Sequence, residues 1–152
     1  MSTDQHQHNW QEDGVRVIRP EQFDANTPQT RGMQRVAAVS KQLAGSKGIW
    51  AGVTTVEKSA TTAKHHHGDQ ETVIYVKSGN IKMRWGNDLE FEENAGAGDF
   101  VYVPPFVPHQ EINGGNEQSI WIIVRTGQEP IVVNLEAVND AQQKVDDHLH
   151  GF

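Results

Sequence analysis

The chain has 152 residues, the usual length of a single domain, and its 36% of hydrophobic residues suffice for one compact core. Its formal net charge of −7, without any basic cluster, argues against nucleic-acid binding, which needs a cationic surface. The absence of cysteine excludes disulfides and thiolate ligands, so that any metal would have to be bound through nitrogen and oxygen atoms.

The beginning of the chain is polar and lacks the charged and apolar regions of a signal peptide. No apolar run in the sequence approaches the length of a membrane span. We therefore expect a cytoplasmic protein without a membrane partner. Residues 1–13 are expected to form a flexible N-terminal arm, in which His6 and His8 belong to a solvated tail and not to a metal site.

Residues 14–135 carry the pattern of a β-rich domain. A short apolar run at 15–18 is expected to be an edge strand, and 33–40 and 49–57 are expected to be the next two strands. Apolar residues also recur at helical spacing over 34–44, so a helix is the alternative for that segment.

A group of histidines precedes the next apolar run. Side chains alternate between the two faces of a strand, so His65 and His67 can direct both imidazoles into one space while His66 faces the other way. After a short turn, Glu71 can join them on the outgoing strand. Tyr75 has the same strand parity as Glu71 and is a candidate for lining the same cavity, although core packing is the default for an aromatic residue.

The second half of the chain predicts short strands separated by turns. Gly79 and Asn80 form a hairpin turn signal, and a second turn is expected at 86–88. Short strands with regular turns are typical of a sandwich or a barrel. The expected strands are 73–76, 81–85, 89–91, 100–103, 110–112, 119–124 and 131–133.

A fourth histidine, His109, follows the expected strand at 100–103. Tyr102, Phe106 and Trp121 lie near it in the sequence and are candidates for a pocket wall, with core packing again the default. Taken alone, the first histidines could be a solvated turn and His109 a core residue that caps a backbone group. Because the histidine pair, a carboxylate and a further strand-associated histidine occur together, a metal site is the favoured interpretation.

These two motifs resemble those of the cupin superfamily. The resemblance runs from Lys64 to Asn113. The first motif reads His65, His67, Glu71 and Gly79, and the second reads Gly98, Pro104, His109 and Asn113.

The sequence departs from the family pattern at two places. Phe106 stands where the family usually has a glycine, so that turn is expected to be built differently. The gap from Glu71 to Gly79 is one residue longer than the commonest family spacing, and strict registration on Gly79 would place Thr72 at the glutamate position. A bulge that absorbs one residue would keep Glu71 as the ligand.

The resemblance implies an all-β, single-domain, cupin-type antiparallel jelly-roll barrel over 14–135. A C-terminal tail at 136–152 is expected to include a short helix, with His148 and His150 solvated. The implied metal ligands are His65, His67, Glu71 and His109.

Three imidazoles and one carboxylate suit several divalent metals. The mixed nitrogen and oxygen donors, together with the resemblance to small bacterial single-domain cupins that bind metals, favour Mn²⁺, with Fe²⁺, Ni²⁺ and Zn²⁺ as alternatives. The implied function is a Mn(II)- or Fe(II)-dependent enzyme that acts on a small carboxylated or oxygenated molecule bound at open metal positions. The alternative is a non-catalytic module that binds or senses a metal or a small ligand. Sheet edges need covering, so we also expect a homodimer in which the strand at 15–18 is exchanged.

Overall fold

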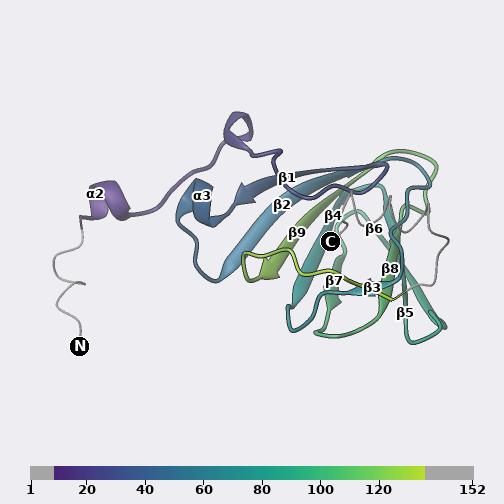
Figure 1. Ribbon diagram of the computed structural model, residues 1–152. Coiled ribbons are helices and arrows are strands. Elements are labelled where there is room, and N and C mark those ends of the chain that lie inside the picture. The colour runs from purple at the N-terminus through teal and green to yellow at the C-terminus, as the bar shows by residue number, and fades with distance from the viewer. Residues whose placement is uncertain (1–8, 136–152) are drawn as a thin grey trace.

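The computed structural model describes residues 9–135, and the expected C-terminal tail and its helix lie outside the described residues. Two five-stranded antiparallel sheets face each other, which confirms the expected all-β jelly roll (Figure 1). In spatial order, the first sheet contains β1 (Met33–Val39), β2 (Ile49–Val56), β9 (Ser119–Thr126), β4 (Thr72–Ser78) and β7 (Phe100–Val103). The second contains β10 (Val133–Asn134), β3 (His65–His66), β8 (His109–Ile112), β5 (Asn80–Trp85) and β6 (Phe91–Gly96).

Helical structure within residues 9–135 is confined to short segments. These are α2 (Trp10–Asp13), the 3₁₀ turn η1 (Pro20–Gln22) and α3 (Lys41–Ala44). The helix considered over 34–44 is present only as α3, where the hydroxyl of Ser40 accepts a hydrogen bond from the backbone N–H of Leu43 and ends the preceding strand. The edge strand expected at 15–18 is not formed, and this segment has no regular structure.

The link between β4 and β5 corrects the expected hairpin at Gly79. The two strands do not pair with each other, because β4 lies in the first sheet between β9 and β7 while β5 lies in the second between β8 and β6. Gly79 has a φ of +83°, and a Cβ at this position would lie 2.1 Å from Oγ of Ser119. The glycine therefore allows the chain to cross between the sheets at a point of close packing.

The core fills the space between the two sheets. Strand alternation supplies it, since every second residue of the central strands is buried. Among the largest fully buried side chains are Trp121, Ile74, Ile81 and Ile123. Within the described residues, no helix has the length and apolar character needed to cross a membrane.

Candidate metal centre

The two sheet-forming histidine motifs meet on the second sheet. His65 of β3 and His109 of β8 are direct cross-strand partners. His67 lies two residues beyond His65 and is buried on the same side, as the alternation predicts. The ring centroid of His65 is 4.4 Å from that of His109 and 4.7 Å from that of His67. The structure therefore brings all three expected histidines into one cluster.

The fourth member of the cluster is Glu111. It follows His109 by two residues on β8, so both side chains point to the same face of that strand. Its Oε1 atom is 3.3 Å from Nε2 of His109, and only 2% of its side chain is exposed. The ligand atoms of His65, His67, His109 and Glu111 all lie within 4.8 Å of one another.

The expected fourth ligand, Glu71, is not in this cluster. It is exposed, and its Oε1 accepts a hydrogen bond of 2.7 Å from the hydroxyl of Tyr102. The next residue, Thr72, is the one that turns into the interior and is 3% exposed. No bulge shifts Glu71 inward, so strand parity directs its carboxylate away from the histidines.

Backbone carbonyls orient each imidazole of the cluster. A carbonyl oxygen only accepts hydrogen bonds, so each Nδ1 carries a proton. Nε2 of His65 and of His67 then keeps its lone pair for a ligand, whereas Nε2 of His109 faces the carboxylate of Glu111. The accepting carbonyls are those of Ala63 for His65 at 2.6 Å, Ile131 for His67 at 2.8 Å and Val107 for His109 at 3.0 Å.

The electrostatics of the interior favour neutral histidines beside a charged carboxylate. Burial and the neighbouring rings hold the pKa of His65 well below its usual value, and burial lowers the pKa of His67 to about 3. Burial alone would raise the pKa of Glu111, but the hydrogen bond and charge of His109 outweigh it and lower that pKa. The same contact raises the pKa of His109 against the effect of its own burial. At neutral pH the cluster therefore offers the protonation states that metal binding requires, once His109 gives up its proton.

Two arginines on the first sheet point into the same interior. Arg35 of β1 and Arg125 of β9 are 3% and 4% exposed, and burial lowers the pKa of each to about 10. The charge of Arg35 acts on Glu111 and helps to keep that carboxylate ionised. The guanidinium of Arg125 lies 4.0 Å from the centre of the Trp50 ring, a cation–π contact that holds it inside the barrel.

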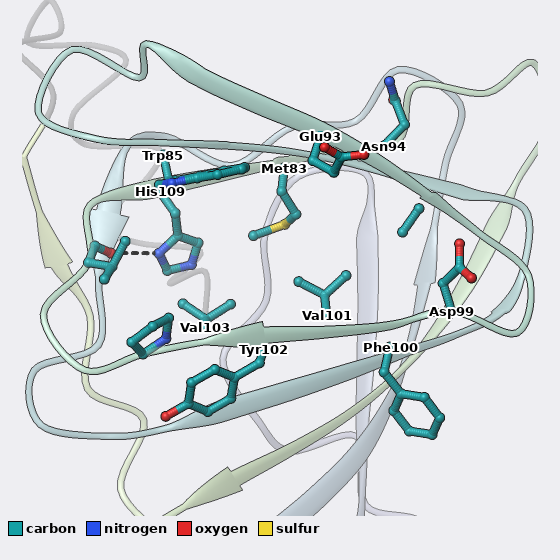
Figure 2. A pocket seen from close by; sticks show the side chains of 13 residues that line it. Met83, Trp85, Glu93, Asn94, Asp99, Phe100, Val101, Tyr102, Val103 and His109 are labelled. Atoms are coloured by element: carbon teal, nitrogen blue, oxygen red, sulfur yellow. Dashed lines mark hydrogen bonds between the residues drawn. The ribbon is translucent and has the colours of Figure 1, made fainter.

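A cavity of about 540 Å³ leads to His109 from the side of the barrel where β7 faces β5 and β6. In Figure 2, Val101 and Val103 point into the space that Met83 and His109 also face, whereas the rings of Tyr102 and Phe100 lie on the other side of β7. The full lining is Met83, Trp85, Glu93, Asn94, Ala95, Asp99, Phe100, Val101, Tyr102, Val103, Pro104, Val107 and His109.

Of the aromatic residues expected to form the pocket wall, only Tyr102 is among the lining residues, and its ring points to the other side of β7. Tyr75 lies on the outer face of β4 beside Phe100, with ring centroids 4.8 Å apart. Trp121 is buried in the core, where its indole N–H donates to the carbonyl of Asn80 at 3.2 Å. Phe106 is 61% exposed. Sequence position near the histidine motif thus did not indicate which aromatic side chains face the cavity.

A family model for the cupin domain matches residues 52–125, a range that includes strands of both sheets and all four residues of the cluster. The matched domain belongs to the cupin superfamily. No curated protein sequence matches this cupin.

Solved structures show the same fold at low sequence identity. The polyketide cyclase RemF from Streptomyces resistomycificus is 18% identical, with a TM-score of 0.69 over 89% of this chain and 98% of its own. An uncharacterized conserved protein with a double-stranded beta-helix domain from Klebsiella pneumoniae is 19% identical, with a TM-score of 0.62 over 81% of this chain and 99% of its own. An oxalate decarboxylase is 25% identical, with a TM-score of 0.62, but this cupin matches 80% of its own length to only 35% of that chain.

Proposed function

We propose that this cupin binds a divalent metal ion through His65, His67, His109 and Glu111 and is an enzyme that acts on a small oxygenated or carboxylated molecule. The observation that carries the proposal is the convergence of three imidazoles and one carboxylate, all buried, within 4.8 Å. Buried ionisable side chains are seldom found close together unless they pair with one another or bind a metal.

Two further observations support the binding of a metal ion by these residues. Nε2 of His65 is buried and has no hydrogen-bond partner among residues 9–135, while its Nδ1 already hydrogen-bonds to the carbonyl of Ala63. Nε2 of His109 and Oε1 of Glu111 are 3.3 Å apart, which is the spacing expected of two atoms that share one ion. The donor set of three nitrogens and one oxygen can hold Mn²⁺, Fe²⁺, Ni²⁺ or Zn²⁺, of which we propose Mn²⁺ first and Fe²⁺ second.

When bound, such an ion supplies Lewis-acid stabilisation of negative charge on a substrate oxygen. The contributions of the chain itself follow from the described contacts. The carbonyl hydrogen bonds of the three histidines fix the orientation of their rings, and Arg35 favours the ionised form of Glu111.

The cavity beside His109 supports a substrate with an apolar body. Met83, Trp85, Val101 and Val103 form much of its wall, and such surfaces favour apolar or aromatic groups. The charged side chains among the lining residues, apart from His109, are the carboxylates of Glu93 and Asp99. These carboxylates disfavour a small dianion such as oxalate, although oxalate enzymes are among the structural neighbours.

Elemental analysis of untagged protein tests the metal, and turnover assays test the enzyme. We expect near-stoichiometric manganese or iron in the native protein and a strong loss in Glu111→Gln. The Mn²⁺ and Fe²⁺ forms are then assayed with oxygenated aromatics and small acids for oxygen uptake, carbon dioxide release or an isomerised product. Tight binding without turnover would support the non-catalytic binding or sensor module instead, and a native protein without transition metal would overturn the proposal.

A further inference from the structure

The imidazole of His67 is oriented by a carbonyl from a distant part of the chain. For the other two histidines of the cluster, the carbonyl that accepts from Nδ1 belongs to the residue two positions earlier in the sequence. The carbonyl that accepts from Nδ1 of His67 is that of Ile131, which is 64 positions further along the chain. The orientation of His67 therefore depends on how Ile131 is held.

Ile131 lies in residues 127–132, a segment without helix or strand that is here called the strap. The strap follows β9 of the first sheet and leads to β10 of the second, so it passes from one sheet to the other (Figure 1). At its start, the N–H of Gly127 donates to the carbonyl of Gly48 at 2.8 Å, and exposed hydrogen bonds hold the side chain of Gln128. At its end, β10 pairs with β3. These contacts leave the middle of the strap, next to Ile131, to be held by another group.

Gln70 holds the middle of the strap from inside the protein. Its side chain is buried, and its Nε2 donates to the carbonyl of Glu129 at 2.6 Å. The backbone N–H of Gln70 donates to the carbonyl of His67 at 3.2 Å, in the turn between β3 and β4. A closed set of contacts therefore runs from His67 through Gln70 and Glu129 to Ile131, and back to Nδ1 of His67.

The strap is stiff and closely packed beside this contact. Pro130 stands between Glu129 and Ile131, and its ring fixes its own φ and restricts the residue before it. Gly127 has a φ of +84°, and a Cβ at this position would lie 2.8 Å from Nε2 of Gln70, so the backbone of the strap lies directly against that amide. A fixed carbonyl at Glu129 therefore also limits the position of the carbonyl of Ile131.

Packing alone does not explain a glutamine at position 70. Oε1 of Gln70 is buried and has no hydrogen-bond partner among residues 9–135. A buried acceptor without a partner is unfavourable, and a methionine would fill a similar volume without one. The hydrogen bond from Nε2 to the strap is therefore the contribution that requires the amide.

We infer that Gln70 is a positioning residue for His67. By holding the strap, it keeps the carbonyl of Ile131 on Nδ1, which leaves Nε2 unprotonated and facing the other members of the cluster. The inference rests on the proposed metal site, where it assigns a role to a residue that contacts no metal. Loss of a group that orients a metal-binding histidine typically lowers metal affinity by about 10- to 100-fold.

NMR of the imidazole nitrogens in the chelator-treated full chain tests the orienting role without any metal. The signals of His67 are assigned by their absence from His67→Asn. We expect the native protein to carry the proton on Nδ1 of His67, and Gln70→Met to show a mixture of the Nδ1–H and Nε2–H tautomers. Calorimetric titration with Mn²⁺ should show an affinity at least about tenfold lower in Gln70→Met than in the native protein.

Two further variants separate the strap from general stability. Gln110 lies on the outer side of β8, and its amide donates to the carbonyl of Thr62 at 3.0 Å. Gln110→Met thus loses a comparable hydrogen bond away from the strap and should match the native protein in both measurements. Pro130→Gly keeps Gln70 but loosens the link between Glu129 and Ile131, and should change the tautomer and the affinity in the same direction as Gln70→Met.

Melting curves establish that each variant is folded, and Pro130→Gly carries the test should Gln70→Met not fold. A native protein with the proton on Nε2 of His67 would overturn the inference. So would the native tautomer and the native Mn²⁺ affinity in the folded strap variants. If the tautomer changes as expected but the native protein binds no Mn²⁺, the orienting role of Gln70 is supported and the proposed metal function is overturned.

Discussion

Oε1 of Glu111 lies 3.3 Å from Nε2 of His109, and both side chains are almost completely buried. The two residues are separated by one position on β8, so their relative placement is fixed by strand geometry. In the metal-free protein this contact is a hydrogen-bonded pair that raises the pKa of His109 and lowers that of Glu111. Metal binding would replace the shared proton with an ion, which links the occupancy of the site to pH.

The first prediction concerns the identity of the carboxylate ligand. Glu111→Gln keeps the shape of the side chain but removes its charge, and we expect Mn²⁺ affinity to fall by at least about tenfold, since even residues outside the ligand shell cost that much. Glu71→Gln is the matched control and should bind Mn²⁺ as the native protein does. Calorimetric titration of chelator-treated protein with Mn²⁺ measures the affinity of both variants. If Glu111→Gln kept its Mn²⁺ affinity and Glu71→Gln lost it, Glu71 and not Glu111 would be the carboxylate ligand.

The position of Glu71 shows what the sequence could and could not determine about the site. Alternation correctly grouped His65 with His67, because His67 directly follows the two-residue strand β3 that begins at His65. Whether Glu71 or Thr72 faces inward depends on the number of residues in the turn after His67. The local sequence pattern does not specify that number. The same rule of alternation, applied forward from His109, would have indicated Glu111.

The second prediction concerns the pH dependence of the metal-free protein. The folded-state pKa values of His65 and His67 lie below the unfolded value of 6.5, and that of His67 is about 3. From about pH 6.5 downward the unfolded chain therefore binds protons that the native state does not. The free energy of unfolding should fall by up to about 1.4 kcal/mol per pH unit for each of these histidines.

His109 acts in the opposite sense, because its raised pKa favours the folded state at low pH, but one such residue does not balance two. Urea unfolding of chelator-treated protein should therefore show lower stability at pH 5.5 than at pH 7.5. His67→Asn should reduce the difference. A stability that is constant or rises toward pH 5.5 would contradict the assigned pKa directions.

The third prediction concerns the turn that precedes His109. Phe106 has a φ of +62°, in the left-handed region, and its N–H donates to the carbonyl of Gly68 at 2.8 Å. The turn therefore contains a phenylalanine in a backbone conformation that favours glycine. The left-handed conformation costs a non-glycine residue of order 1–2 kcal/mol.

Phe106→Gly relieves this strain and Phe106→Ala keeps it, while both variants lose the ring contact with His66. We expect the glycine variant to be more stable than the alanine variant by about 1 kcal/mol in urea unfolding. An alanine variant as stable as the glycine variant would show that the turn is not strained.

The fold was more predictable than the pairing of its strands. The stretch at 100–103 was placed correctly, because a short apolar run bounded by turn residues is a local signal. The pairing after Gly79 was not, since a glycine turn indicates a change of direction but not whether the next strand joins the same sheet. That choice depends on the close approach of Gly79 to Ser119, which is forty residues away in the sequence and invisible to a local pattern.

The last prediction concerns the ligand that the cavity accepts. Trp85 lines the cavity, is the cross-strand partner of His109 and stacks on Phe91 with ring centroids 5.8 Å apart. A ligand with an aromatic body and two adjacent oxygens could place its ring beside Trp85 and its oxygens toward the metal cluster. We expect 2,3-dihydroxynaphthalene to bind the Mn²⁺-loaded protein more tightly than oxalate does.

Trp85→Ala should weaken binding of that probe by at least about tenfold, because an aromatic anchor in a buried pocket carries much of the binding energy, and should leave the metal content unchanged. Phe106→Ala is the matched control, since this exposed aromatic residue does not line the cavity. Calorimetry on the three proteins, with melting curves to establish that each is folded, measures the difference. The prediction is contradicted if oxalate binds as tightly as the aromatic probe and the Trp85 variant binds both with unchanged affinity. In that case the space directly around the metal, and not the apolar wall, selects the ligand.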